Sequence, residues 1–510
     1  MKTRIGIFTC FFFSIAVSCG PSRRSEFAAV TMEPLPPNAP VAEPAAEPDP
    51  CFTHGSQDDA RPPLSVRTLF SEGTTYLKSS NSDPGDYFGY SVAISGDMAV
   101  VSAEREDSSA VGVNGDQCDN SMLGVGAAYV FRHKNGKWRQ EAYLKPASAE
   151  WVGYFGTKVA ASGDTIVVKS YNGNDDGTQN ANPQYGSNHN LTGSATVFER
   201  IRGRWKQTAL LKTSGGWQMS RFSEIAISGD TIALSVFYRQ GTTTDPISYY
   251  TGQAAVAIFR RNSTGWYQET VLVPSLREEA SFPMWGLEFG TSIDVSGDLL
   301  VASVSGWFRC SHSNVHIYRR KSGKWVPQAE LKHSKFYCSA GDNFGYFGNE
   351  VAIAGSSIVV GAPKRGGVNA PRGGGFPTDC SVALYSAKAG RWRFQQTLSI
   401  PSGPDCRFFG KAVAGSSELI AVSANREIPW CTPLEGAIYL YTPGEQGWTL
   451  HERVQSPYPN MVREFGMVLD VSGTNVITSS IKEDSGATSV NSDPLTGRAD
   501  ASGAAYIYSR

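Results

Sequence analysis

The sequence has no excess of charge of either sign. Its 46 basic and 47 acidic residues leave a formal net charge of −1, and charged residues make up only 18% of the 510 residues. A protein that binds nucleic acid needs a basic surface to neutralise the phosphates. We therefore expect no nucleic-acid partner.

Catalytic motifs are also missing. The chain has seven histidines, none of them in an H-E-x-x-H pattern, and it contains no G-x-S-x-G, P-loop or Cys-x-x-Cys motif. Its Gly-x-Trp turns lack the Asp and Thr that an Asp-box of the sialidase type requires. The sequence therefore gives no indication of an enzyme.

A helical pattern is absent as well, because no apolar stripe with the period of a helix follows residue 30. Short runs rich in Val, Ile, Tyr and Phe alternate instead with turns that contain many of the 53 glycines. This composition predicts an all-β chain.

The N-terminus is a targeting segment. A basic start precedes an apolar stretch over 5–17, which is too short to span a bilayer. The stretch runs into "AVSC" at 16–19, which resembles the lipobox of bacterial lipoproteins. The resemblance implies a signal peptide over 1–18, lipidation of Cys19 and, because Gly20 follows, anchoring in the outer membrane of a bacterial cell envelope. Ordinary secretory cleavage is the alternative.

Residues 19–64 are rich in Pro, Ala and Glu and have no apolar periodicity. We interpret them as a disordered or polyproline-like tether that holds a folded body, residues 65–510, away from the membrane.

A Phe-Gly pair, or a variant of it, recurs seven times from residue 88 onward, at intervals of 56 to 67 residues. Each copy opens a unit with the same order of features. An apolar strand and a tight turn, often Ser-Gly-Asp, are followed by a second strand, a variable loop and a third strand. A turn with Gly then leads to a fourth strand that begins near a Trp. Four antiparallel strands repeated seven times predict a seven-bladed β-propeller, in which the regular Phe and Trp side chains pack between blades.

The two ends of the chain complement each other. The seventh unit stops after its third strand at Arg510, while residues 69–80 hold an extra strand that ends in Tyr-Leu-Lys at 76–78, as the fourth strand of the first unit does at 143–145. We expect this N-terminal strand to complete the last blade and to close the ring. A linear solenoid would leave the strand unpaired.

The units resemble the FG-GAP repeat of integrin α-chain heads and, more closely, bacterial integrin-like repeat proteins. The letters "GAP" at 361–363 and the long loop within 104–131 carry this resemblance, together with the repeated Phe-Gly. It covers residues 69–510. It implies the propeller fold and says little about function, because propellers serve binding, scaffolding and catalysis.

Integrin-type repeats often bind calcium between their first and second strands. This chain has only a tight turn there, and a single Asp in such a turn supplies too few oxygens for a cation that takes roughly six to eight. We interpret these residues as turn formers that bond their own backbone. They are Asp97, Asp164, Asp230 and Asp298.

The loops between second and third strands are long and polar in the first, second and seventh units, which are neighbours in a closed ring. Oxygen-rich loops side by side predict a face that binds a protein, a glycan or Ca²⁺. Ordinary solvated loops have the same composition, which is the alternative. The candidate ligand-binding residues are Glu106, Asp107, Asn114, Asp116, Asp119, Asp175, Asp176, Glu483, Asp484, Asn491 and Asp493.

Four of the nine cysteines hold matching places in two units. Cys310 and Cys338 lie in the fourth unit where Cys380 and Cys406 lie in the fifth, which predicts the disulfides Cys310–Cys338 and Cys380–Cys406 in an exported protein. A Cys406–Cys431 bond is a rival pairing. The partners of Cys51, Cys118 and Cys431 stay open.

We interpret the chain as an exported, lipid-anchored binding or adhesion module whose partner is an envelope or extracellular protein or a glycan. One alternative is a scaffold or assembly factor of the cell envelope that uses the same face. Another is a propeller hydrolase acting on polysaccharide, which would need carboxylates that converge near the central channel. No cofactor is required, and Ca²⁺ is the one that the acidic loops could hold.

Overall fold

The computed structural model describes thirteen segments of the chain. These are residues 73–149, 151–171, 193–219, 224–238, 253–274, 287–306, 313–332, 347–363, 381–400, 408–424, 436–456, 464–494 and 497–509. In these segments no helix is long and apolar enough to cross a membrane.

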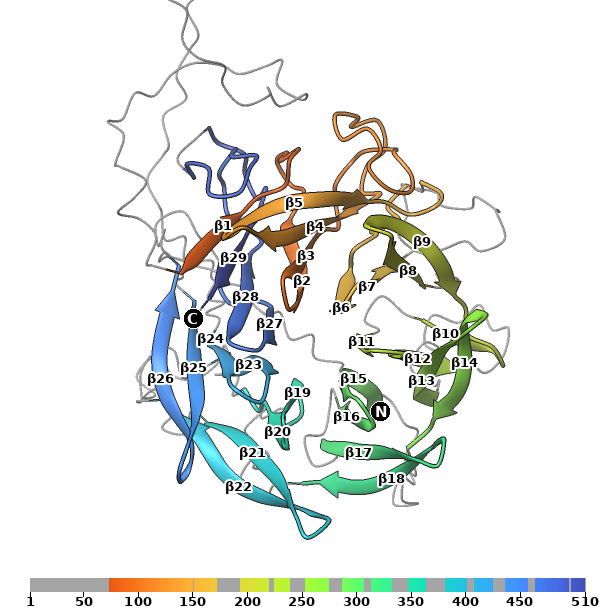
Figure 1. Ribbon diagram of the computed structural model, residues 1–510, viewed down its shortest axis with the longest axis vertical. Helices are drawn as coiled ribbons and strands as arrows, with labels where there is room; N and C mark the ends of the chain where they lie inside the picture. The colour runs from red at the N-terminus through yellow and green to blue at the C-terminus, as the bar shows by residue number, and fades with distance from the viewer. Residues whose placement is uncertain are drawn as a thin grey trace, which may run out of the picture. The chain divides into compact units, whose positions relative to one another are not determined.

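The strands form seven antiparallel sheets, the blades of a β-propeller (Figure 1). Blade 1 consists of β2 (Phe88–Ser95), β3 (Met98–Ala103), β4 (Ala127–Lys134) and β5 (Lys137–Leu144). Blade 2 consists of β6 (Lys158–Ser162), β7 (Thr165–Ser170), β8 (Ser194–Ile201) and β9 (Arg204–Leu211). Blade 3 consists of β11 (Ile225–Ser228), β12 (Thr231–Tyr238), β13 (Gln253–Asn262) and β14 (Gly265–Leu272), and the short β10 (Trp217–Gln218) joins it.

The remaining blades repeat this order. Blade 4 consists of β15 (Leu287–Ser296), β16 (Leu299–Gly306), β17 (Asn314–Lys321) and β18 (Lys324–Leu331). Blade 5 consists of β19 (Val351–Ala354), β20 (Ser357–Val360), β21 (Ser381–Lys388) and β22 (Arg391–Ser399). Blade 6 consists of β23 (Phe409–Gly415), β24 (Ile420–Ala424), β25 (Ala437–Gly444) and β26 (Gly447–Gln455). Blade 7 consists of β27 (Leu469–Ser472), β28 (Asn475–Ser480), β29 (Ala504–Tyr508) and β1 (Thr74–Leu77).

Blade 7 closes the ring as the sequence predicts. The N-terminal strand β1 pairs antiparallel with β29, and Tyr76 lies opposite Tyr506. The outermost strand of the last blade therefore comes from the start of the chain, which leaves no open edge between the two ends.

The hydrophobic core lies between blades rather than at the centre of the ring. Each of the seven pairs of neighbouring blades shares one cluster of buried side chains. The phenylalanine of the Phe-Gly pair sits in each cluster where the structure describes it, as Phe155 does between blades 1 and 2. This explains why the motif repeats, because each blade needs the same apolar anchor against the blade before it.

The glycine of the motif is required by the same close packing. Gly156 has φ +98°, and a Cβ atom there would lie 2.7 Å from Cβ of Ser102 and 2.9 Å from the carbonyl oxygen of Ala127, both in blade 1. No side chain fits at this point of contact between blades.

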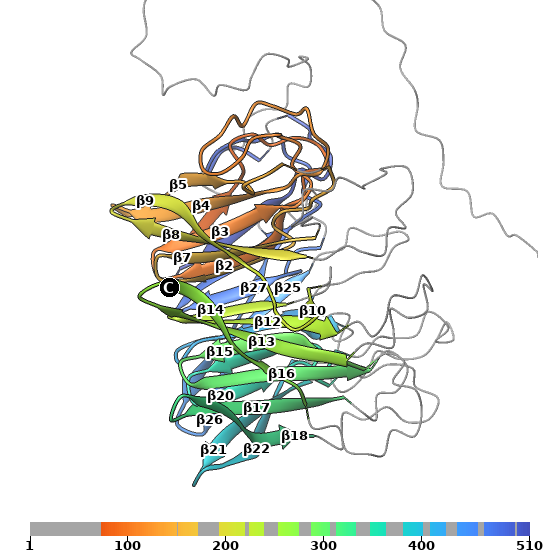
Figure 2. The same ribbon diagram turned by 90° about the vertical axis from the view of Figure 1, so that its right-hand side faces the viewer.

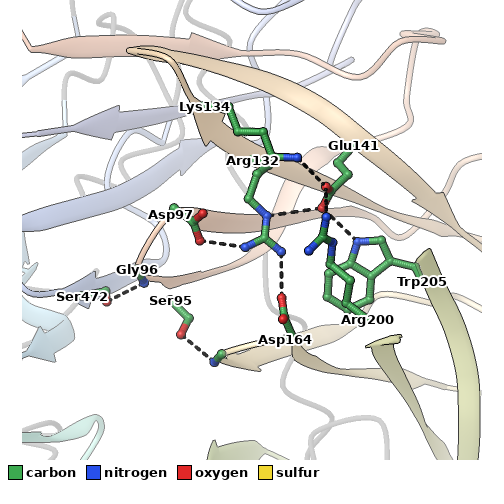
Figure 3. Close-up of polar contacts among 11 residues, drawn as sticks. Ser95, Gly96, Asp97, Arg132, Lys134, Glu141, Asp164, Arg200, Trp205 and Ser472 are labelled. Carbon is green, nitrogen blue, oxygen red and sulfur yellow. Dashed lines mark hydrogen bonds and ion pairs between the residues drawn. The ribbon is translucent and has the colours of Figure 1, made fainter. Parts of the chain in front are cut away.

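The serine of the turn between first and second strands joins a blade to the next at four junctions. Ser95 Oγ accepts a hydrogen bond of 2.9 Å from the backbone N–H of Gly163, and Ser472 Oγ accepts an equivalent bond of 2.9 Å from Gly96 (Figure 3). Ser162 and Ser228 make the same bond to the turns of blades 3 and 4. These bonds link the turns of blades 7, 1, 2, 3 and 4 in succession.

Three of the turn aspartates, Asp97, Asp164 and Asp230, also form ion pairs, which the sequence analysis did not anticipate. Arg132 in β4 contacts Asp97 Oδ1 of its own blade at 2.7 Å and Asp164 Oδ1 of blade 2 at 3.0 Å (Figure 3). Glu141 contacts Arg132 at 3.3 Å and Arg200 of blade 2 at 3.1 Å. Opposite charges on third and fourth strands therefore bridge the blades at their turn ends.

The tryptophans pack between blades as predicted. Trp205 Nε1 donates to Glu141 Oε2 of the preceding blade at 3.1 Å, and Trp325 Nε1 makes the same contact with Glu269 Oε2 at 3.1 Å. Both indole rings are buried. They fill structural positions and are not available to a ligand.

The propeller has two unlike faces. The turns within the strand pairs 1–2 and 3–4 lie on one side, the turn face, and the connections 2–3 and 4–1 lie on the other, the loop face. The long connections of blades 1 and 7 lie next to each other on the loop face (Figure 2).

Candidate functional site on the loop face

Two long loops dominate the described part of the loop face. The blade 1 loop, residues 104–126, leaves β3 and enters β4, and the blade 7 loop, residues 481–503, leaves β28 and enters β29. Both contain Glu-Asp-Ser, at 106–108 and at 483–485. The two loops share their internal contacts, so they are one structural motif used twice.

Glu106 anchors the blade 1 loop to the fourth strand of its own blade. Its Oε2 lies 2.6 Å from Nζ of Lys145, and its Oε1 accepts a bond of 2.6 Å from the hydroxyl of Tyr143. Asn81 Nδ2 donates to the same Oε1 at 2.9 Å, and Tyr129 donates to Asn81. All these side chains are buried.

Glu483 holds the same place in the blade 7 loop. Its Oε2 lies 3.1 Å from Nζ of Lys78, which follows β1, and its Oε1 accepts a bond of 3.2 Å from Tyr76. Lys78 also donates to the carbonyl oxygen of Gly503 at 2.6 Å and to Ser502 Oγ at 2.8 Å. These buried contacts join the first strand of the chain to its last loop.

Burial sets the protonation of these clusters. It lowers the pKa of Lys78 and of Lys145, and it raises the pKa of Glu483 against the opposing effect of Lys78. Burial together with the charge of Glu106 raises the pKa of Tyr143, so its phenol keeps its proton and donates. The side chains of both Lys-Glu clusters are buried, and the clusters fix the base of each loop.

The next residues of the motif hold the loop backbone. Asp107 Oδ1 accepts from the N–H of Gly124 at 2.7 Å, and Asp484 Oδ1 accepts from Ala501 at 2.9 Å. Asn114 exchanges two bonds with the backbone of Tyr143 in β5, through its N–H and its Oδ1. Asn491 does the same with Tyr76 in β1. Each loop is thus bonded across its own two ends and to the outermost strand of its blade.

The remaining acidic candidates are closer to solvent. Asp119 accepts from the backbone and hydroxyl of Ser109 and from the N–H of Ser121, and these bonds lower its pKa to about 2. Asp116 Oδ1 accepts from the N–H of Cys118 at 3.0 Å. Asp493 is part-buried in the blade 7 loop. Asp175 and Asp176 lie outside the described residues, and the ligand-binding role of all these residues stays a prediction.

Cys118 in the blade 1 loop is disulfide-bonded. Its partner lies outside the described residues, as do Cys19, Cys51 and Cys431. The predicted pairs Cys310–Cys338 and Cys380–Cys406 also fall there and stay predictions.

A groove of about 580 Å³ lies where the blade 7 loop meets blade 1. Residues 488–491 of the blade 7 loop, residues 137–140 of β5 and Ser80 line it together. Gln140 Nε2 donates to Ser80 Oγ at 2.7 Å, which joins β5 to the segment after β1. Hydroxyl and amide groups, the aromatic residues Phe131 and Trp138, and the basic residues Lys137 and Arg139 line the groove, and such a mixture of apolar and polar groups is typical of a ligand pocket.

The first strands line the inside of the ring (Figure 1), and charged side chains that the sequence analysis missed meet there. Lys158 Nζ of blade 2 lies 2.8 Å from Glu224 Oε1 of blade 3. Ser292 of blade 4 donates to Glu350 Oε2 of blade 5 at 2.8 Å. Although burial opposes its charge, Glu224 and Glu350 raise the pKa of Lys158. Burial and then Glu224 raise the pKa of Glu350 to about 7.

Two further carboxylates join the first strands of neighbouring blades. Asp294 Oδ2 accepts from the N–H of Ile353 at 2.6 Å, and Asp470 Oδ2 accepts from Ile94 at 2.7 Å. Burial raises the pKa of Asp294 to about 7 and that of Asp470 to about 6. All these channel carboxylates bond to a neighbouring blade, so their first effect is on the cohesion of the ring.

A family model described as "FG-GAP repeat" matches residues 74–131, from the N-terminal strand to the third strand of blade 1. The other blades repeat the same strand order and start with Phe-Gly, except that Ser223 replaces the glycine in blade 3. This chain is a seven-bladed β-propeller whose residues 74–131 match the FG-GAP repeat. The fold indicates a module of the binding or adhesion type.

No curated protein matches the sequence of this FG-GAP propeller. Solved structures with a similar fold include a proposed 6-phosphogluconolactonase from Bacteroides uniformis, 11% identical, where the match covers 69% of this chain and 84% of that chain with a TM-score of 0.41. A chain of the mitotic checkpoint complex is 12% identical, and the match covers 90% of this chain and 99% of that chain, also with a TM-score of 0.41. At this similarity neither carries an argument about function.

The described part of the FG-GAP propeller holds no group of three or more His, Cys, Asp or Glu side chains placed to share a metal ion. In the turns between first and second strands, Asp97, Asp164 and Asp230 contact arginines. In the described loops, a Ca²⁺ ion would therefore need backbone, amide or water oxygens in addition to the one or two carboxylates that lie near each other.

Proposed function

We propose that this FG-GAP propeller is an exported, lipid-anchored binding module that presents the loop face around blades 7 and 1 to a protein or glycan of the cell surface. Cys19 carries the lipid, and residues 19–64 hold the propeller away from the bilayer. Two or more acyl chains on one cysteine supply the stable anchoring that a single chain does not.

The observation that carries the proposal is the rigid construction of the two loops. Each loop is fixed at its base by a buried Lys-Glu pair and along its length by an Asn that bonds the edge strand. The groove between the blade 7 loop and β5 is therefore formed before any ligand arrives. A preformed site loses less conformational entropy on binding and binds more tightly for it.

The disulfide of Cys118 supports export. Disulfides persist in oxidising compartments and are rare in the cytosol. A disulfide in the blade 1 loop also fits a surface that works outside the cell, where loops meet proteases.

The first test concerns the groove. Ser489→Trp places a large side chain in the groove wall, and Ser263→Trp places the same side chain on the turn between β13 and β14, on the opposite face. Binding of the purified proteins to intact cells and to isolated envelope polysaccharide is then measured. The proposal expects Ser489→Trp to reduce binding severalfold and Ser263→Trp to bind like the wild type. Equal binding by both variants would contradict it.

The second test concerns the anchor. Cys19→Ala should move the protein from the membrane fraction to the soluble exported fraction, because the lipid has no other attachment point. Cys51→Ala is the matched control and should leave the protein in the membrane fraction. A Cys19→Ala protein that stays membrane-bound would show that the lipoprotein interpretation is wrong.

A further inference from the structure

Two large apolar side chains stand exposed together on the loop face between blades 1 and 2. Leu123, at the tip of the blade 1 loop, is 57% exposed, and Trp151, in the connection to blade 2, is 48% exposed. The N–H of Val152 donates to the carbonyl oxygen of Leu123 at 2.9 Å, which places the two segments side by side. We call Leu123, Trp151 and Val152 the apolar tip.

The backbone under the apolar tip is fixed. Tyr154 N–H donates to Gly124 at 2.9 Å and Phe155 N–H donates to Val125 at 2.8 Å, so three successive bonds join the two segments. Asp107 holds the loop side of this ladder through its bond to Gly124. The apolar side chains are therefore presented on a rigid support.

The same support occurs at the junction of blades 7 and 1 with different side chains. There the N–H of Gly85 donates to the carbonyl oxygen of Asp500 at 2.9 Å, and Phe88 donates to Ser502 at 2.8 Å. By these bonds Asp500 corresponds to Leu123, Gly85 to Val152, and Pro84 to Trp151. Asp500 is exposed and pairs with Arg498 at 2.6 Å. The fold therefore does not require an apolar side chain at the tip.

Val152 adds a second indication. Its φ of +50° lies in the left-handed region, where the corresponding Gly85 has φ +87°. A β-branched residue in this conformation is a steric outlier, and such strain is found where function selects the side chain. The chain thus carries three apolar residues at the junction of blades 1 and 2, one of them strained, where the equivalent junction has polar and small ones.

The surroundings of the apolar tip are acidic. The blade 1 loop, residues 104–126, contains five carboxylates and one arginine, and Lys145 balances only Glu106. Asp107 and Asp119 are bonded to the segment that carries Leu123, and Asp119 stays ionised across the physiological range. A partner that covers the tip meets this negative charge at its rim.

We propose that the apolar tip is the docking point for a protein partner that inserts apolar side chains surrounded by Lys and Arg. This rests on the proposed binding function and names its partner class. Exposed Trp and Leu with a charged rim are typical of protein interfaces. A glycan site would need hydrogen-bonding side chains beside the aromatic ring, whereas the segment bonded to Val152 presents Leu123.

Peptide display on the full-length protein in detergent tests this. Random peptides are selected on the wild type, and their affinities are then measured on Trp151→Ala and on Leu123→Asp. The second variant introduces the residue type that Asp500 provides at the corresponding position in blade 7. Leu450→Ala, on β26, removes a side chain of similar exposure, 43%, and is the control. We expect peptides with aromatic or aliphatic centres and basic flanks. Their affinity falls at least about tenfold in both tip variants, is unchanged in the control and weakens with salt.

The outcomes separate this inference from the proposed function. Peptides that bind both tip variants as tightly as the wild type but are blocked by Ser489→Trp would place the binding site in the groove and overturn the docking point alone. Enrichment of acidic peptides, or glycan binding that depends on Trp151, would overturn the partner class. No binding of any peptide or envelope glycan would overturn both.

Discussion

Lys78 and Glu483 are 405 residues apart in the chain, and their side chains form a buried ion pair with Nζ and Oε2 3.1 Å apart. Lys78 follows the strand that closes the ring, and Glu483 begins the loop that faces solvent. One contact therefore joins ring closure to the candidate binding face. Lys145 and Glu106 repeat it in blade 1 at 2.6 Å.

Removing one partner of the closing pair should be costly. In Glu483→Gln the ammonium of Lys78 keeps its burial and loses its counter-charge, so we expect the free energy of unfolding to fall by about 3–5 kcal/mol. Replacing both with apolar residues, Lys78→Met with Glu483→Leu, should cost less. Urea denaturation measures both, and the exposed Glu445→Gln is the control. A single variant as stable as the control would contradict the role of the pair.

The glycine of the Phe-Gly pair should tolerate no side chain. Gly156→Ala places a Cβ against Ser102 and Ala127 of the preceding blade, in addition to its left-handed φ of +98°. We expect a loss of at least about 3 kcal/mol in the free energy of unfolding. Gly136→Ala also has a positive φ, +74°, but nothing lies within 4 Å of its Cβ, so it should lose only about 1 kcal/mol. Equal losses of unfolding free energy in the two variants would show that the close contact between blades is not the reason for glycine at position 156.

Arg132 should matter more than an exposed arginine in an ion pair. Its side chain is 8% exposed and contacts three carboxylates of two blades. Arg132→Met should lower the free energy of unfolding by about 2 kcal/mol, since Asp97, Asp164 and Glu141 lose a shared partner. Arg498→Met removes a pair in which the arginine side chain is 78% exposed, and it should change stability far less than Arg132→Met does. Thermal denaturation of both variants tests whether the ion pairs of Arg132 hold blades 1 and 2 together. Equal melting temperatures of the two variants would show that they do not.

The channel carboxylates should make the propeller more stable in mild acid. The pKa values of Asp294 and Asp470 rise on folding, from the ordinary value of 3.8 to about 7 and about 6. The folded state thus binds more protons than the unfolded state between these values, so stability is greatest at low pH and is lost as the pH rises through about 7. Melting temperatures from about pH 5 to about pH 8 should fall, and fall less in Asp294→Asn. An unchanged slope in that variant would show that Asp294 does not supply it.

The fold could be predicted from the sequence because each blade repeats the same physical requirement. The Phe-Gly start, the turn and the apolar strands recur at each contact between blades, and the Tyr-Leu-Lys at 76–78 and 143–145 marks the missing fourth strand. The ion pairs of the turn aspartates could not be predicted from the sequence. Their partners are arginines on third strands, such as Arg132, and a single turn does not show which strand faces it.

The site was only partly predictable. Glu106 and Glu483 lie in the long polar loops, but the sequence alone does not show that Lys145 and Lys78 reach under these loops. The signal was present, because Glu-Asp-Ser and Tyr-Leu-Lys occur together in blades 1 and 7 and nowhere else in the described residues. The channel charges were missed because they show only after the units are aligned on the turn glycine. Lys158, Glu224 and Glu350 precede glycines 163, 229 and 355 by the same number of residues.

The central claim is that the loop face around blades 7 and 1 meets the partner. The most direct measurement places a photoreactive amino acid at Ser489 in the groove wall, at Leu123 in the apolar tip and at Ser263 on the turn face, and crosslinks the anchored protein on living cells. We predict adducts from Ser489 or Leu123 and none from Ser263. Adducts from Ser263 alone would place the working surface on the turn face and contradict the claim.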